Sequence, residues 1–359
     1  GLEGPDPRGW YDKGAVEFDN VREACRLGLA HGWHEQTAAS LLSLGEFGQR
    51  RIVGEVYMLM AELAKRLPAG HELELRVMAA AVFNAQTRGD TALAEHFFAR
   101  FAATEAQAPD RIEPEVLAWF GTANWIRGRT DRAIVLQQEA AAQFEAEGEL
   151  HRAAFVLSTL SMAQDAVDRE EAHRSAERCI ELAESLDSPN VLCSGLLSLT
   201  GVQAHHDHGA ARATAAQLVM MAREAGALWF EATGTRLEGH TASRAGDLHE
   251  ASEIFARALD LNGVGDFGEL LWYTVLNVVE HLGRAGLHED AALALGAFSV
   301  APGASRDQLV TRAVDRLAER LGGTLAPDVF DECFGGGAEL ATGELLIHLD
   351  GVLRAHAQV

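Results

Sequence analysis

The chain has 359 residues, 48% of them hydrophobic and 23% charged, and its formal net charge is −23. This balance is typical of a soluble folded protein, and the acidic charge argues against sequence-independent nucleic-acid binding, which requires clustered cations. No apolar run reaches the roughly 20 residues of a membrane helix, and four dispersed cysteines fit reduced thiols, so we expect a cytoplasmic protein without a membrane partner.

The first 16 residues, "GLEGPDPRGWYDKGAV", contain neither an apolar signal-peptide core nor an initiator methionine. We expect residues 1–16 to be a linker, and we expect the chain to be a piece of a longer protein.

Residues 17–300 predict helices with apolar spacing near 3.6, separated by short turns, and no stretch predicts a strand. The turns recur every 38 to 41 residues, at Gly48, Gly89, Gly128, Val167, His208, Gly246 and Gly286. A small residue follows each turn by five positions, at Val53, Ala94, Ala133, Ala172, Ala213, Ala251 and Ala291, and Gly121, Gly201 and Gly239 precede three turns by seven. A fixed period of this size predicts a solenoid of about seven helical hairpins, in which small residues let paired helices approach closely.

Two of these segments resemble tetratricopeptide (TPR) repeats. In "LAWFGTANWIRGRTDRAIVLQQEAA" the residues Gly121, Gly128, Ala133 and Ala140 occupy the family's small-residue positions, and "RLEGHTASRAGDLHEASEIFARAL" adds Phe255 at the large aromatic position. The resemblance implies an all-α fold, a right-handed α-solenoid. The repeat period in this sequence, about 39–40 residues, exceeds the 34 residues of an ordinary TPR repeat, so we expect longer helices.

Residues 301–359 predict a helix, a short helix after Pro327, a glycine run from Gly335 to Gly337 and a last helix. We expect this segment to be a cap that covers the final apolar face of the solenoid.

Both ends of the chain resemble large bacterial ATP-dependent regulators of the LuxR and antibiotic-regulator types, built on signal-transduction ATPases (STAND), and related multidomain cyclases. The opening matches the phrase with which their repeat domain begins at Trp10, Glu17, Asp19, Asn20, Val21, Arg22 and Ala24, while Cys25 replaces a leucine. The tail matches at Leu321, Gly322, Phe330, Gly337 and Leu340, and departs from the family phrase at Thr342 and Gly343. The resemblance implies an upstream ATPase domain as an intramolecular partner.

The chain itself carries no recognisable catalytic motif. Neither Lys13 nor Lys65 has the context of a P-loop, and no His-Glu pair has a second histidine at zincin spacing. The stretch "GVGDFG" over residues 263–268 follows a predicted helix rather than the strand that a dinucleotide fold requires. We therefore predict no enzyme activity and no cofactor.

Candidate binding residues are those that, counted in phase with the turns, line the concave face of the predicted solenoid. They are Trp125, Gln164, Asp165, His205, His206, Arg236, His240, Arg244 and Tyr273, with Glu280 in the same phase.

Three interpretations of "HHDH" at 205–208 stay open: a solvated helix end, a cationic patch for an anionic ligand or acidic peptide, or a metal site. Adjacent His205 and His206 would point apart on a helix, so we predict no metal site. The two aromatic residues, Trp125 and Tyr273, are either core or ligand platform.

The sequence thus predicts a non-catalytic regulatory module that binds a small-molecule inducer, a protein or a peptide in its groove, within a bacterial ATP-dependent transcriptional or signalling regulator. The alternative is a stand-alone TPR scaffold for protein–protein interaction. Neither interpretation includes direct nucleic-acid binding by this segment.

Overall fold

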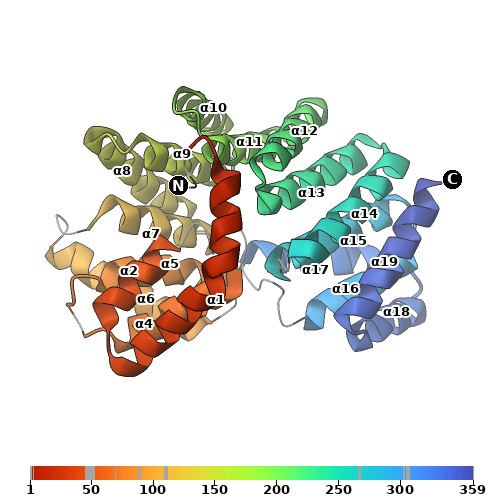
Figure 1. Ribbon diagram of the computed structural model, residues 1–359. Helices are drawn as coiled ribbons and strands as arrows, with labels where there is room; N and C mark the ends of the chain where they lie inside the picture. The colour runs from red at the N-terminus through yellow and green to blue at the C-terminus, as the bar shows by residue number, and fades with distance from the viewer. Residues whose placement is uncertain are drawn as a thin grey trace. The chain divides into compact units, whose positions relative to one another are not determined.

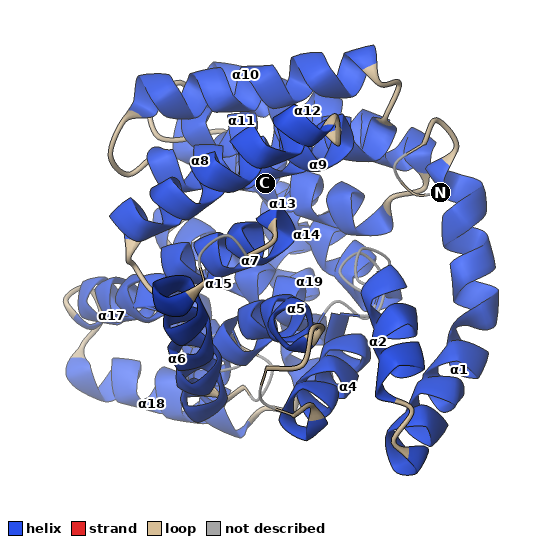
Figure 2. Ribbon diagram, turned by 90° about the vertical axis from the view of Figure 1, so that its left-hand side faces the viewer, coloured by secondary structure: helices blue, strands red, loops and turns tan. Residues whose placement is uncertain are grey.

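The computed structural model describes residues 2, 4–44, 53–68, 70–87, 90–108, 112–265, 268–301, 304 and 308–358. These residues form helices and no strand (Figures 1 and 2). The helices are α1 (Pro7–His31), α2 (His34–Ser43), α4 (Val53–Arg66), α5 (Glu74–Thr87), α6 (Thr91–Gln107), α7 (Pro114–Ile126), α8 (Thr130–Glu147), α9 (Leu150–Gln164), α10 (Arg169–Ser185), α11 (Pro189–Gln203), α12 (His208–Ala225), α13 (Leu228–Ala245), α14 (Leu248–Gly265), α15 (Gly268–Arg284), α16 (His288–Val300), α17 (Gln308–Gly322), α18 (Pro327–Glu339) and α19 (Thr342–Ala357). None of these helices is both long and apolar enough to cross a membrane.

The chain divides into two compact units. Unit 1 comprises residues 1–202 and 221–227, and unit 2 comprises residues 203–220 and 228–359. The predicted turn positions Gly48 and Gly89, and residue Asp266 of the "GVGDFG" stretch, lie outside the described residues.

Unit 1 contains the helix pairs α5–α6, α7–α8 and α9–α10. In the α7–α8 pair a Cβ added at Gly121 would lie 2.6 Å from Gln137 Cγ, so the missing side chain allows the two helices to approach. Gly128 turns the chain between them in a left-handed conformation, with φ of 73°, which glycine adopts without steric cost. Ala133, the predicted small residue after this turn, is fully buried. The close-packed hairpin expected from this segment is confirmed.

The N-terminal segment is helical from residue 7, where the sequence analysis expected a linker up to residue 16. Asp6 caps the helix by accepting a hydrogen bond from Gly9 N at 3.4 Å, and Pro7 suits the first helical position because it has no N–H to leave unpaired. Tyr11 is buried, and its hydroxyl donates to Asn190 Oδ1 on α11 at 3.1 Å. These contacts fix α1 within unit 1.

Unit 2 repeats the same hairpin construction in the pairs α13–α14 and α15–α16. A Cβ at Gly239 would lie 3.1 Å from the ring of Phe255, the large aromatic residue of the resemblance. The turns at Gly246 and Gly286 have φ of 96° and 80°, as the repeat pattern predicts. In contrast, a Cβ at Gly201 would meet no atom within 4 Å, so that glycine is not required for close packing.

The last three helices belong to unit 2. The glycine run expected to interrupt the chain lies inside α18, where Gly337 is buried against α16. A Cβ at Gly337 would lie 2.7 Å from the carbonyl carbon of Leu293, and one at Gly296 would lie 2.8 Å from that of Phe334. The two glycines therefore allow backbone-to-backbone packing of α16 and α18. Helix α19 packs on α14 and α16, with Leu345, Leu349 and Leu353 fully buried.

Candidate functional site

The predicted site residues fall in both units. Trp125, Gln164 and Asp165 belong to unit 1, and the remaining six belong to unit 2. They are therefore considered as two separate groups.

In unit 1, Gln164 does not lie on an open surface. Its side chain is buried, and its Oε1 accepts a hydrogen bond of 2.7 Å from Ser175 Oγ, which joins α9 to α10. Asp165 is the half-buried C-cap residue of α9, and Trp125 is half-buried near the end of α7. The prediction that Gln164 lines an open binding surface is therefore corrected. Its amide is buried within the α9–α10 hairpin, where the hydrogen bond from Ser175 offsets the cost of burying a polar group.

The "HHDH" stretch is the start of a helix. His205 and His206 are exposed in the turn before α12, and Asp207 accepts a hydrogen bond of 2.9 Å from Ala210 N. This is the N-cap role for which aspartate is favoured, and it accounts for the carboxylate among the histidines. Within the described part of the chain, no group of three or more His, Cys, Asp or Glu side chains is arranged to hold a metal ion.

Polar side chains of α13 meet those of α15 within unit 2. Arg236, His240 and Arg244 are spaced four residues apart and so share one face of α13. Arg236 Nη1 donates to Asn277 Oδ1 at 2.6 Å, and Arg244 Nη1 donates to Glu280 Oε1 at 3.2 Å. The structure therefore brings together three of the predicted residues and adds Asn277 to them.

Burial and neighbouring charges shift the protonation of this group. Burial, together with Arg236, Arg244 and Arg284, lowers the pKa of His240 to about 4 despite the opposing effect of Glu280, so the imidazole is neutral at pH 7. Burial also lowers the pKa of Arg236 to about 10, and Tyr273 opposes this shift. Burial would raise the pKa of Glu280, but His240 and the nearby arginines lower it. At neutral pH these side chains therefore comprise the carboxylate of Glu280, a neutral His240 and several guanidinium ions.

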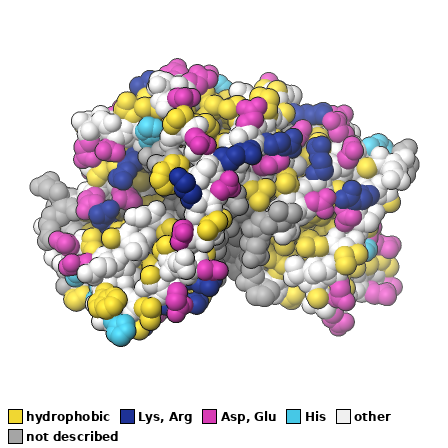
Figure 3. Space-filling model, in the orientation of Figure 1, with side chains coloured by type: hydrophobic (Ala, Val, Ile, Leu, Met, Phe, Trp, Pro, Cys, Tyr) yellow, Lys and Arg dark blue, Asp and Glu magenta, His cyan; other side chains and the backbone are white. Residues whose placement is uncertain are grey.

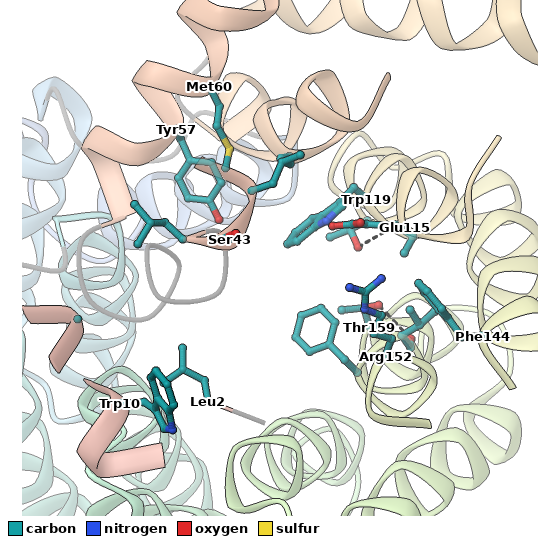
Figure 4. Close-up of a pocket in the computed structure, with 18 of the residues that line it drawn as sticks. Leu2, Trp10, Ser43, Tyr57, Met60, Glu115, Trp119, Phe144, Arg152 and Thr159 are labelled. Atoms are coloured by element: carbon teal, nitrogen blue, oxygen red, sulfur yellow. Dashed lines mark hydrogen bonds between the residues drawn. The ribbon is translucent and has the colours of Figure 1, made fainter. Parts of the chain in front are cut away.

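Unit 1 contains a cavity of about 620 Å³, which we call the aromatic cavity (Figure 4). Trp119 of α7 and Arg152 of α9 face Tyr57 of α4 across it. Its lining residues are Leu2, Trp10, Lys13, Gly14, Glu17, Leu42, Ser43, Leu44, Tyr57, Met60, Ala80, Glu115, Ala118, Trp119, Thr122, Phe144, Arg152, Phe155, Val156 and Thr159.

Three aromatic rings contact one another across successive repeats, and two of them, Trp119 and Phe155, line the aromatic cavity. The ring centroids of Phe83 and Trp119 are 6.4 Å apart, and those of Trp119 and Phe155 are 6.3 Å apart. The three residues come from α5, α7 and α9, and all three are half-buried. None of the three is among the predicted site residues, although their equal spacing of 36 residues is visible in the sequence. Such rings offer a large, rigid apolar surface to a ligand.

Charged side chains of both signs border the aromatic cavity. Glu115 pairs with Arg76 at 3.6 Å, and Arg152 pairs with Glu149 at 3.9 Å while half of its side chain stays exposed. A second hollow of about 360 Å³ shares Leu42, Ser43, Glu115 and Arg152 with the cavity. Figure 3 likewise shows acidic, basic and apolar side chains interspersed over one face of the molecule. The cavity thus combines an apolar lining with polar groups that can orient a ligand.

No protein-family model matches the chain, and no curated protein matches it. Among solved structures it is similar to a Rap protein complexed with competence and sporulation factor, with 12% identity over 96% of this chain and 99% of that chain and a TM-score of 0.60. It is also similar to a STAND protein with a tetratricopeptide repeat sensor from Pyrococcus horikoshii, with 14% identity over 84% of this chain and 52% of that chain and a TM-score of 0.46. The first likeness and the helix pairs above confirm the predicted all-α, TPR-like helical-repeat fold.

Proposed function

We propose that this chain is a non-catalytic sensor module that binds a small molecule or a peptide in the aromatic cavity of unit 1. The observation that carries the proposal is the cavity itself: about 620 Å³, lined by Trp119, Phe155 and Tyr57 and bordered by Arg152 and Glu115. Ligand pockets of proteins are concave, mostly apolar and supplied with a few polar groups, and their volumes span this value.

The fold supports the proposal. Stacked hairpins build one surface from several helices, so a single ligand contacts several repeats at once. Here α4, α7 and α9 all contribute side chains to the cavity. The Rap protein of the comparison is complexed with competence and sporulation factor, so a fold of this kind accommodates a bound factor.

The context that we propose is a bacterial ATP-dependent transcriptional or signalling regulator of the LuxR-like STAND type. Support comes from the resemblance of the opening, through Trp10, Glu17 and Asp19, to the start of the repeat domain in such proteins. A ligand that favours one conformation of the module would then bias an attached ATPase between two states. A stand-alone scaffold for protein partners is the second candidate. Sequencing the source gene beyond both ends distinguishes them, because only the regulator has a P-loop domain upstream.

Binding in the aromatic cavity can be tested with anilinonaphthalenesulfonate (ANS), an apolar fluorescent anion, as the probe. We expect saturable binding to the folded protein, and Trp119→Ala should weaken it about tenfold or more because it removes a large ring from the cavity wall. The control is Trp33→Ala, since Trp33 is 55% exposed in unit 1 and does not line the cavity. The proposed location would be contradicted if both variants lost affinity equally, or if neither variant lost affinity.

Of the other predicted residues, Trp125, Asp165, His205 and His206 stay proposals for partner contact outside the cavity. His205 and His206 are exposed in the turn before α12.

A further inference from the structure

Guanidinium groups outnumber the carboxylates they contact on the face that α13 shares with α15. Arg244 and Arg284 both reach Glu280 Oε1, at 3.2 Å and 3.5 Å, and Arg320 of α17 also acts on this carboxylate. Arg236, one turn of helix before His240, is hydrogen-bonded to the neutral amide of Asn277. We call Arg236, Arg244 and Arg284 the arginine cluster.

The cluster has hydrogen-bonding capacity that the protein leaves unused. The Nε atoms of Arg236 and Arg244 are both buried without a hydrogen-bond partner. A buried donor without a partner is costly, and a charged donor more so. Arginine presents its donors in a planar fork that matches the oxygens of a carboxylate or a phosphate. The unused donors therefore suit an oxyanion.

The three arginines converge near His240 although they come from separate turns of two helices. Arg236 and Arg244 lie one turn before and one turn after His240 on α13, and His240 Nδ1 lies 4.0 Å from Glu280 Oε2. Burial is the main cause of the lowered pKa of this imidazole, and the three guanidinium charges lower it further, against the opposing effect of Glu280. Positive charge that disfavours a further cation at His240 favours an anion at the same place.

The surrounding charge makes the excess of cations more notable. The whole chain carries a formal charge of −23, whereas on this face two arginines, Arg244 and Arg284, pair with the single carboxylate of Glu280, and Arg236 is bonded to a neutral amide. Arg244 and Arg284 are 35% and 34% exposed and Glu280 is 23% exposed, so water and salt screen these charges less than charges on the open surface.

We propose that the arginine cluster of unit 2 binds an oxyanionic group, the phosphate or the carboxylate of a ligand, beside His240 and Glu280. The group would accept hydrogen bonds from the unpartnered Nε atoms of Arg236 and Arg244, and the charge of Arg284 would complete the site. Such charge-assisted, forked hydrogen bonds are among the strongest that proteins make. This site lies wholly in unit 2, so the test of this proposal is independent of the test of ligand binding in the aromatic cavity.

The test uses the full chain with inorganic phosphate and, in a second arm, malonate as probes, each compared with chloride at equal ionic strength. Calorimetric titration should show saturable binding of at least one probe, and the stronger arm identifies the ligand group. Arg236→Gln should weaken that binding about tenfold or more, because it removes a charge-assisted hydrogen bond. Arg257→Gln is the matched control, since Arg257 is an exposed arginine of α14 in the same unit.

Glu280→Gln provides the opposite perturbation. It removes the competing carboxylate, so it should strengthen binding of the probe several-fold if the cluster is an anion site. If Glu280 instead serves only to hold the arginines together, this variant leaves probe binding absent or unchanged, which would overturn the proposal. No saturable binding of either probe to the unmodified chain would overturn it as well.

A measurement on the unmodified chain guards against variants that fail to fold. Saturating phosphate or malonate should raise the pKa of His240, followed by NMR of its imidazole, because a bound anion favours the protonated ring. Chloride at equal ionic strength should leave that pKa near 4. The same pKa in all three solutions would contradict an oxyanion beside His240.

Discussion

Replacement of Gly337 by alanine should destabilise unit 2 strongly, whereas the same change at the neighbouring glycines should not. The added Cβ would lie 2.7 Å from the carbonyl carbon of Leu293, closer than real Cβ contacts come, and 3.0 Å from its Cα. The obstacle is backbone on α16, so no side-chain rotation relieves it. Helix α18 would have to move away from α16, where Gly296 makes the reciprocal contact with Phe334.

The size of the effect follows from two opposing contributions. Overpacking of a close interface costs about 1–3 kcal/mol, and we expect the upper end because backbone must shift. Alanine in place of glycine within a helix stabilises by up to about 1 kcal/mol. Gly335 and Gly336 lie in the same helix with no atom within 4 Å of an added Cβ, so their alanine variants should be neutral or stabilised. Gly337→Ala should therefore be less stable than Gly336→Ala by about 2–3 kcal/mol.

Urea denaturation followed by circular dichroism measures the free energy of unfolding of each variant. A lower midpoint with an unchanged slope for Gly337→Ala is the expected result. Equal stability of Gly337→Ala and Gly336→Ala would refute the close approach of α16 and α18.

Further predictions concern unit 2 and the α9–α10 hairpin. Burial, with His356 and Arg284, lowers the pKa of His281 to about 4, below its ordinary value of 6.5, so the unfolded chain binds the extra proton. Stability should be fully present above pH 6.5 and fall by about 3 kcal/mol as the pH falls to 4, with a shallower slope in His281→Gln. Leu349→Ala should cost about 2–5 kcal/mol, because Leu349 is fully buried in α19, whereas Ile347→Ala, at a residue 77% exposed, should change stability by about 0.5 kcal/mol or less. Ser175→Ala should cost about 1–3 kcal/mol, since it leaves the buried Gln164 oxygen without its donor. Urea denaturation checks each of these values, between about pH 4 and pH 7 for His281. An unshifted midpoint for Leu349→Ala or Ser175→Ala, or a stability independent of pH in the unmodified chain, would count against the corresponding contact.

The repeat architecture could be predicted from the sequence because it depends on local features with a fixed period. Glycine in a left-handed turn, as at Gly128 and Gly246, and a small residue where helices pair, as at Ala133, leave a visible pattern. The start of α1 could also have been predicted, because Asp6 followed by Pro7 is an N-cap signal. The packing of the tail could not be predicted, because a run of glycines such as Gly335 to Gly337 usually indicates the end of a helix. Here the run lies inside α18, since Gly337 packs against the backbone of α16.

The site was less predictable, because side-chain direction depends on contacts between helices that are distant in sequence. Counting in phase with the turns selected Gln164, whose amide is bound by Ser175 of the next helix. The same counting selected Trp125 and passed over Trp119, which faces the aromatic cavity six residues earlier on α7. It also selected Arg236 and Arg244, whose partners Asn277 and Glu280 come from the following repeat.

Fluorine NMR of protein labelled with fluorotryptophan tests most directly whether the aromatic cavity binds a ligand. The chain has six tryptophans, and Trp119→Phe assigns the resonance of Trp119 while Trp33 provides a reference outside the cavity. Titration with ANS should shift the Trp119 resonance saturably and leave that of Trp33 unchanged. An unmoved Trp119 resonance under conditions where ANS is bound would contradict the account.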